Sequence, residues 1–179
     1  YNGYNQYLLE QNAIDYDDIL FYAYRILSEN PSVVRLYTSL YRYICVDEAQ
    51  DLNFAQYEAI KALCGTEYKN IMFVGDENQS IYGFNGSDSS LMAKSFVNDF
   101  SPTVYMLHEN FRSAKAIVTF ANQLEKTDNV SNYYYEGELK AYAFSNEKDE
   151  ALFIIRRIEQ LIKEGHKDIE GDLSYDDFA

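Results

Sequence analysis

The chain has 179 residues, of which 29 are acidic and 15 basic, so its formal net charge is −14 at pH 7. A chain of this length buries roughly 70% of its unfolded surface, which is enough for a hydrophobic core. The negative charge argues against strong DNA binding by the chain alone, because basic residues supply most non-specific affinity. No signal peptide and no apolar run long enough to cross a bilayer are found. A cytoplasmic location and no membrane partner are therefore expected.

Apolar residues at helical spacing and short apolar runs alternate along the chain. The spacing predicts helices at residues 16–28, 33–40, 54–63, 91–97, 113–126 and 148–163. Apolar runs predict strands at residues 43–46, 71–74 and 104–107. Less regular extended segments are expected at 133–135 and 139–144, and a loop at 128–132. The alternation predicts an α/β fold, with a largely parallel sheet and flanking helices.

Some local features of these elements are also predicted. Gly65 and Gly165 are expected to end the helices that precede them, and Ser113 to cap the helix that follows Arg112. The run at 71–74 does not alternate, which is typical of a strand buried on both faces. Cys45 is expected to be buried in the first strand, and Cys64 at the end of an apolar helix. The two cysteines suggest neither a disulfide framework nor a metal site.

The first strand leads directly into two adjacent acids, in the sequence YICVDEAQD at residues 43–51. Carboxylates at the C-terminal end of a strand are how nucleotide hydrolases hold Mg²⁺ and direct a water at a phosphate. In this interpretation Asp47 supports Mg²⁺, which prefers carboxylate and water oxygens. Glu48 then takes the proton of the attacking water. The alternative is that the acid pair only caps the next helix.

The strand at 71–74 is followed by a polar loop in the sequence NIMFVGDENQSIYGFNGS, at residues 70–87. Open α/β sheets bind ligands at the carboxyl ends of parallel strands, which makes Gln79 a candidate site residue. Tyr82 and Phe84 lie on the same loop beside Gly83, and exposed rings there would stack on nucleic-acid bases. The alternative is that both rings fill the core beneath the loop.

Arg112 lies in the sequence LHENFRS at residues 107–113, between a predicted strand and a predicted helix. An arginine at such a junction can stabilise charge on a phosphoryl group during transfer. The alternative is a surface salt bridge, which is the commonest role of an isolated arginine.

Together and in this order, the segments VDEAQD, VGDENQSIYGFNGS and ENFRS resemble the second, third and fourth motifs of the UvrD/Rep/PcrA family of superfamily 1A DNA helicases. DYDDIL at 15–20 and EKDEALFIIRRIEQLI at 147–162 are also similar to segments of that family. The resemblance covers nearly the whole chain. It implies incomplete parts of two RecA-like domains, with residues 1–107 in the first and 108–179 in the second.

The resemblance also implies the roles of individual residues. Asp47 would coordinate Mg²⁺, Glu48 would be the catalytic base, and Gln79 would sense the γ-phosphate of ATP or position the attacking water. Arg112, in the second domain, would reach the γ-phosphate as an arginine finger. Tyr82 and Phe84 would contact single-stranded DNA. Asn85 follows them where the family usually has arginine, which removes a charge from the DNA-binding loop.

The phosphate-binding sequence GxxxxGK[ST] does not occur in the chain. Its backbone amides and lysine normally hold the triphosphate of ATP, so the chain by itself is expected neither to hydrolyse ATP nor to unwind DNA. We interpret the chain as the central part of an ATP-dependent 3′-to-5′ helicase of DNA repair or replication. Unpaired sheet edges would favour self-association, which light scattering at high concentration would test.

Two other functions are compatible with the same residues. One is the helicase part of an AddA/RecB-type helicase-nuclease, which shares these motifs and would carry a nuclease domain elsewhere. The other is a non-catalytic interaction module that retains the fold. The adjacent acids Asp47 and Glu48, together with Gln79 and Arg112, argue against the second, because unused neighbouring carboxylates cost stability.

Overall fold

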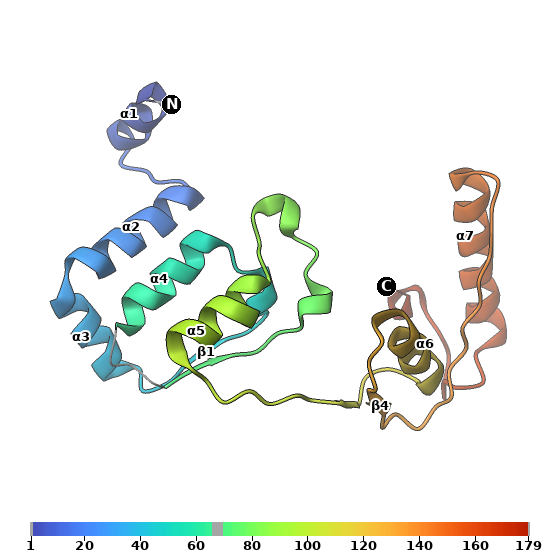
Figure 1. Cartoon of the computed structure of the whole chain (residues 1–179). Coiled ribbons are helices and arrows are strands. Elements are labelled where there is room, and N and C mark those ends of the chain that lie inside the picture. The colour runs from blue at the N-terminus through green and yellow to red at the C-terminus, as the bar shows by residue number, and fades with distance from the viewer. Residues whose placement is uncertain (1, 66–69, 179) are drawn as a thin grey trace. The chain divides into compact units, whose positions relative to one another are not determined.

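The computed structural model describes residues 2–65 and 70–178 (Figure 1). The chain divides into two compact units, Tyr1–Val104 and Tyr105–Ala179. Both units combine helices with a pair of parallel strands, so the predicted α/β class is confirmed. Compact units are not by themselves RecA-like domains, and that assignment for residues 1–107 and 108–179 stays a prediction.

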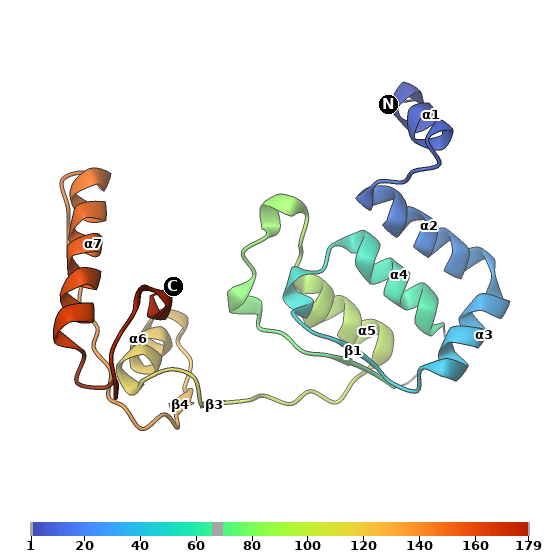
Figure 2. The ribbon, with the colours of Figure 1, turned by 180° about the vertical axis from the view of Figure 1, so that it is seen from behind.

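The first unit begins with three helices, α1 (Asn2–Glu10), α2 (Tyr16–Glu29) and α3 (Pro31–Leu40). Helix α1 was not predicted, whereas α2 and α3 were. Asp15 caps α2 through a capping box with Asp18, in which each side chain accepts a hydrogen bond from the other residue's backbone N–H. Pro31 starts α3, where its missing N–H costs nothing. Helices α2 and α3 contact α4 (Phe54–Cys64), as Figure 1 and Figure 2 show.

The sheet of the first unit pairs β1 (Ile44–Val46) with β2 (Ile71–Phe73) in parallel. In this register Ile44 lies opposite Ile71, and Val46 opposite Phe73. The ladder continues past both strands, because the Val74 N–H donates to the Val46 carbonyl at 2.8 Å. The two strands therefore end at the same edge of the sheet.

The core of this unit lies on one face of the sheet. Ile71 and Phe73 pack against the buried residues Tyr57, Leu91 and Phe96, and the Phe73 and Phe96 rings stack with centroids 4.0 Å apart. Tyr57 belongs to α4 and Phe73 to β2. Phe96 ends a π-helical stretch, Leu91–Phe96, that continues into α5 (Val97–Phe100). A helix was predicted at residues 91–97, but not its π-helical geometry.

The predicted burial of 71–74 on both faces is wrong. Met72 is 55% exposed and Cys45, its partner across the ladder, is also exposed. Successive strand residues point to opposite faces, and among the described residues only one face is covered by helices. Cys64 is buried in α4 as predicted, and burial raises the pKa of its thiol to about 11.

Asp99 of α5 connects this helix to α4. Its carboxylate pairs with Lys61 Nζ at 3.0 Å and accepts a hydrogen bond from the Tyr57 hydroxyl at 2.9 Å. The hydrogen bond from Lys61 is the larger cause, and the one from Tyr57 the smaller, that hold the pKa of Asp99 below its usual value. A carboxyl with a lowered folded-state pKa stabilises the fold above its unfolded pKa, and this contribution is lost as the pH falls through the folded pKa.

Asp99→Asn is therefore expected to lower the free energy of unfolding at neutral pH by about 1 kcal/mol or less, because the pair is partly exposed. The loss should shrink as the pH is lowered from neutral to a value below the lowered pKa of Asp99, where the wild-type carboxyl is protonated. Urea denaturation of the chain at both pH values measures it. An equal loss at both would contradict the ionic contribution.

The second unit contains β3 (Glu109–Asn110), α6 (Lys115–Glu125), β4 (Val130–Ser131) and α7 (Glu147–Glu164). Strands β3 and β4 pair in parallel, with Glu109 opposite Val130. Helix α7 ends at Gly165, which has a φ of 76°, as predicted from the glycine. A short 3₁₀ turn, Tyr175–Asp177, follows.

Several predictions for this unit are wrong. Residues 104–107 form no strand, and all four side chains are exposed, because they have neither a partner strand nor a core to cover. The predicted loop at 128–132 contains β4, while 133–135 and 139–144 form no strand. Ser113 does not cap α6, since the N-cap position is occupied by Ala114.

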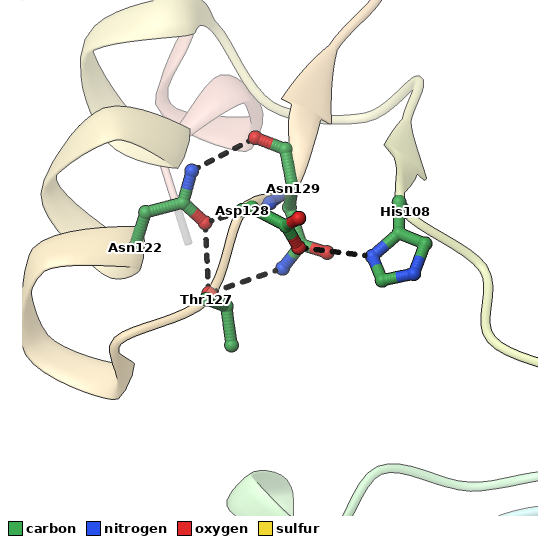
Figure 3. Close-up of polar contacts among 5 residues, drawn as sticks. All are labelled: His108, Asn122, Thr127, Asp128 and Asn129. Carbon is green, nitrogen blue, oxygen red and sulfur yellow. Dashed lines mark hydrogen bonds and ion pairs between the residues drawn. The ribbon is translucent and has the colours of Figure 1, made fainter.

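The turn between α6 and β4 is held by one side chain of α6 (Figure 3). Asn122 donates to the Asn129 carbonyl at 2.8 Å, and its own side-chain oxygen accepts bonds from the Asn129 N–H and the Thr127 hydroxyl. Asp128 lies 3.3 Å from His108 Nδ1, just before β3. These contacts connect the starts of β3 and β4 to the end of α6. Arg112 lies just after β3.

Candidate functional site

The two acids predicted to act in catalysis follow β1 directly and are exposed at the edge of the sheet. Glu48 has a left-handed backbone with a φ of 50°, and its N–H donates to Asp47 Oδ1 at 2.9 Å. A residue other than glycine in this conformation costs on the order of 1–3 kcal/mol and is typical of functional sites. Glu48 thus ends the strand abruptly and starts the 3₁₀ turn Ala49–Asp51.

Gln50 is the residue that connects the acids to the loop after β2. Gln50 is only 1% exposed. Its Nε2 donates to Glu48 Oε2 at 2.7 Å, and its Oε1 accepts from the Asp76 N–H at 3.1 Å. The Gln50 carbonyl accepts a hydrogen bond from the Ser80 hydroxyl at 3.3 Å. Gln50 lies within VDEAQD, but no role was predicted for it from the sequence. A polar residue just after two site acids was the available signal.

Gly75 makes this arrangement sterically possible. A Cβ atom added at Gly75 would lie 2.4 Å from Gln50 Oε1 and 2.8 Å from Met92 Sδ. The backbone after β2 therefore approaches the Gln50 amide more closely than a residue with a side chain allows. The Ala49 N–H donates to the Val74 carbonyl at 2.9 Å and holds the two segments together.

Gln79 lies in the 3₁₀ turn Glu77–Gln79, which Asp76 caps by accepting from the Asn78 N–H. The Gln79 amide donates to Asp76 Oδ2 at 2.9 Å. Asp76 is also the residue whose N–H reaches Gln50. The structure thus links Glu48 to Gln79 through Gln50 and Asp76. Gln79 itself is exposed, and its side chain bonds Asp76 rather than Asp47 or Glu48.

The predicted DNA-contacting residues lie on the next part of the same loop. Phe84 is 88% and Tyr82 46% exposed, with ring centroids 6.1 Å apart. Neither ring belongs to the core of the described residues, so the core-filling alternative does not hold for Phe84. Asn85, also exposed, ends the turn Gly83–Asn85.

The part of the loop that carries Tyr82 and Phe84, here called the aromatic loop, is hydrogen-bonded to the segment that follows the acids. The Ser87 hydroxyl donates to the Asp51 carbonyl at 2.7 Å, and the Asp88 N–H donates to the Leu52 carbonyl at 3.0 Å. An isolated antiparallel bridge also pairs Asn53 with Ser87. These contacts anchor the C-terminal end of the loop that carries Tyr82 and Phe84, and the Ser80 bond to the Gln50 carbonyl anchors its N-terminal end.

Arg112 belongs to the second unit, where it is exposed on a tight turn after β3. The Asn110 side-chain oxygen accepts the Arg112 N–H at 3.0 Å and the Ser113 N–H at 2.8 Å. Sequence reasoning missed this role of Asn110, although asparagine is a common former of such turns. Within residues 105–178 the Arg112 guanidinium forms no ion pair, so the salt-bridge alternative finds no partner there.

The residues at the sheet edge are compatible with Mg²⁺. Mg²⁺ is usually bound by one or two carboxylates and keeps several waters, so it needs no complete protein cage. Asp47 presents an exposed carboxylate, and only its Oδ1 forms a hydrogen bond among the described residues. No cluster of three or more potential metal-ligating residues occurs in the described part of the chain. No helix in the same residues is long and apolar enough to span a membrane.

The chain is similar in sequence to known DNA helicases. The sequence profile of the UvrD/REP helicase N-terminal domain matches residues 1–101. The chain is 35% identical over 176 residues to the ATP-dependent DNA helicase PcrA of Staphylococcus aureus, which covers 93% of this chain and 24% of that protein. It is 34% identical over 174 residues to DNA helicase II of Rickettsia typhi, covering 92% of this chain and 26% of the relative.

A probable DNA helicase II homolog of Rickettsia felis is also 34% identical, over 172 residues. The chain spans about a quarter of the length of these relatives. The profile match extends over more than half of the chain and includes both strands of the first sheet and the loops that follow them. The chain belongs to the UvrD/REP helicase family.

Proposed function

We propose that the full-length protein that carries this chain is an ATP-dependent 3′-to-5′ DNA helicase, which translocates on single-stranded DNA and unwinds duplexes in repair or replication. The parallel pairing of β1 and β2 carries this proposal, because it brings the two acids and the loop that contains Gln79 to one sheet edge. Membership of a DNA helicase family supports it. We assign the two units to parts of two RecA-like domains on the same grounds.

In the proposed mechanism, residues of this edge, and Arg112 of the second unit, act on ATP and a water molecule. Mg²⁺, when bound with ATP, supplies neutralisation of the phosphate charge during phosphoryl transfer. Asp47 would hold the ion through its exposed carboxylate. Glu48 would orient the attacking water and accept its proton. Gln79 would sense the γ-phosphate or position the same water, and Arg112 would stabilise the charge on the transferred group.

Two assays of the full-length protein test the proposal. The first is ATP hydrolysis with and without single-stranded DNA, for which we expect stimulation by DNA. The second is strand displacement from duplexes with a 3′ or a 5′ single-stranded tail, for which we expect unwinding from the 3′ tail only. Absence of ATP hydrolysis would support the non-catalytic module instead, and unwinding from the 5′ tail would overturn the direction.

The aromatic loop is proposed to contact single-stranded DNA, with Tyr82 and Phe84 stacking on bases and Asn85 hydrogen bonding beside them. Tyr82→Ala and Phe84→Ala are each expected to weaken single-strand binding by about 1–3 kcal/mol, since each removes one stacked ring. Fluorescence anisotropy with a labelled oligonucleotide measures the affinity of the full-length protein at fixed salt.

Tyr16→Ala provides the matched control, because this ring is 89% exposed on α2, outside the loop. It should leave DNA affinity unchanged. Asn85→Arg should raise affinity and steepen its salt dependence, because it adds a cation beside the backbone of the nucleic acid. Unchanged affinity in both loop variants would remove the rings from the DNA path.

A further inference from the structure

The side-chain amide of Gln50 has two contacts of different kinds, and chemistry permits only one orientation for it. A carboxylate can only accept and a backbone N–H can only donate, so Nε2 must face Glu48 and Oε1 must face Asp76. The residue is 1% exposed. Both ends of this buried amide are therefore occupied by partners at the proposed site.

The contact with Glu48 restricts a side chain that has little other support. Glu48 is exposed, and its left-handed backbone already separates it from the regular strand. No other hydrogen bond to the Glu48 carboxylate is formed within the described parts of the chain. A glutamate has several rotatable bonds, so the bond from Gln50 Nε2 at 2.7 Å selects one carboxylate position.

The other contacts of Gln50 lie in the loop that carries Gln79. Its Oε1 accepts from Asp76, its carbonyl accepts from Ser80, and Gly75 borders the amide closely. Asp76 in turn accepts the Gln79 amide at 2.9 Å. A displacement of residues 75–80 would therefore move the Gln50 amide, and through it the Glu48 carboxylate.

We infer that Gln50 is a positioning residue that holds the Glu48 carboxylate and transmits the conformation of the residue 75–80 loop to it. This inference rests on the proposed ATP hydrolysis by the same site. Gln50 is buried and bonds Glu48, so in this role it acts through Glu48 and not on the substrate itself. Its effect should therefore appear in the rate of turnover rather than in nucleotide affinity.

Gln50→Met tests the inference in the full-length protein, because methionine retains the volume but makes neither hydrogen bond. We expect kcat for ATP to fall about 10- to 100-fold, the loss typical of a displaced catalytic group. KM for ATP should change less than about twofold, because the substitution removes no contact that holds ATP equally in the ground state and the transition state. The stimulation of ATP hydrolysis by single-stranded DNA should also decrease, since the link to the loop is broken.

Gln50→Glu supplies a readout that loss of packing alone would not change. A neutral Glu side chain reproduces the pattern, with its O–H donating to Glu48 and its carbonyl oxygen accepting from Asp76. An ionised one cannot donate and repels Glu48. Because burial raises the pKa of such a carboxyl, kcat of this variant should fall between about pH 7 and pH 9. Neither wild type nor Gln50→Met should show that descending limb.

Tyr57→Phe is the control for general destabilisation, because it removes a buried hydroxyl bonded to Asp99 in the same unit. It should leave kcat and the pH profile as in wild type. In the 179-residue chain itself, amide hydrogen exchange at Asp76 should accelerate in Gln50→Met and not in Tyr57→Phe. That measurement does not depend on enzymatic activity.

The outcomes separate this inference from the proposed function. If wild type hydrolyses ATP and Gln50→Met has the same kcat, or if Tyr57→Phe loses as much activity, the positioning role of Gln50 is overturned. The same holds if the Gln50→Glu profile parallels that of Gln50→Met. If wild-type protein does not hydrolyse ATP, the proposed function fails, and the exchange of the Asp76 amide alone still decides whether the bridge exists.

Discussion

Replacing Glu48 with glutamine is expected to abolish steady-state ATP turnover of the full-length protein, with a loss of at least about 100-fold. A glutamine side chain has nearly the same shape but cannot accept the proton of the attacking water. Asp47 is unchanged, so binding of ATP with Mg²⁺ should persist. Steady-state ATPase measurements, paired with titration of a fluorescent ATP analogue, separate these two effects.

The position of Glu48 explains why a large effect is expected from this residue and not from a neighbouring acid. It is exposed at the sheet edge, has the left-handed backbone conformation, and accepts the hydrogen bond of a buried amide. An acid that only caps the following turn would need none of these. In fact the turn Ala49–Asp51 has no side-chain cap from Glu48.

Glu29→Gln is the matched control, because it makes the same change of charge at the end of α2, where Glu29 pairs with Arg25 on the surface. It should leave turnover unchanged. Comparable ATPase activity in Glu48→Gln and wild type would refute the role of Glu48 as the base. Loss of nucleotide binding in Glu48→Gln would indicate instead that Glu48 contributes to holding Mg²⁺.

Replacing Arg112 with alanine is expected to lower ATP turnover by about 10³-fold or more, as for other arginines that stabilise phosphoryl transfer. Arg112 is available for such a role, because its guanidinium is exposed and forms no ion pair within residues 105–178. Its backbone is held by the Asn110 turn, so the substitution removes the side chain without removing the support of the loop.

Arg112→Lys tests whether charge alone suffices. Lysine keeps the positive charge but lacks the planar pair of donors that matches phosphate oxygens, so most of the loss should remain. Arg156→Ala is the control, since Arg156 is exposed on α7 in the same unit. Full activity of Arg112→Ala would return this residue to an ordinary surface role. A higher KM for ATP with unchanged kcat would show a contribution to ground-state binding only.

Much of the secondary structure could be predicted because local features decide it. Helices α2, α4 and α7 were predicted from their apolar spacing, and Gly65 and Gly165 mark where the last two end. Strands β1 and β2 were predicted from short apolar runs. The resemblance to the UvrD/Rep/PcrA family was also present in the sequence, because three motifs occur in order, and the family is confirmed.

The failed predictions concern features that depend on neighbours. Residues 104–107 have strand-like composition, but a strand exists only where another strand pairs with it. Met72 and Cys45 are exposed because helices cover a single face of the sheet in the described residues, which no apolar run can reveal. Conversely, Val130 and Ser131 form β4 because the Asn122 contacts bring them beside β3.

The sequence by itself determined the residue types of the candidate site and the order in which they follow the strands. Only the tertiary structure decided how they are connected. The parallel register of β1 and β2 brings residues 47–50 and 75–80 together, although more than twenty positions separate these segments in the sequence. The Gln50 amide can then bond both Glu48 and Asp76, because a hydrogen bond requires atoms within about 3 Å and sequence order does not specify that distance.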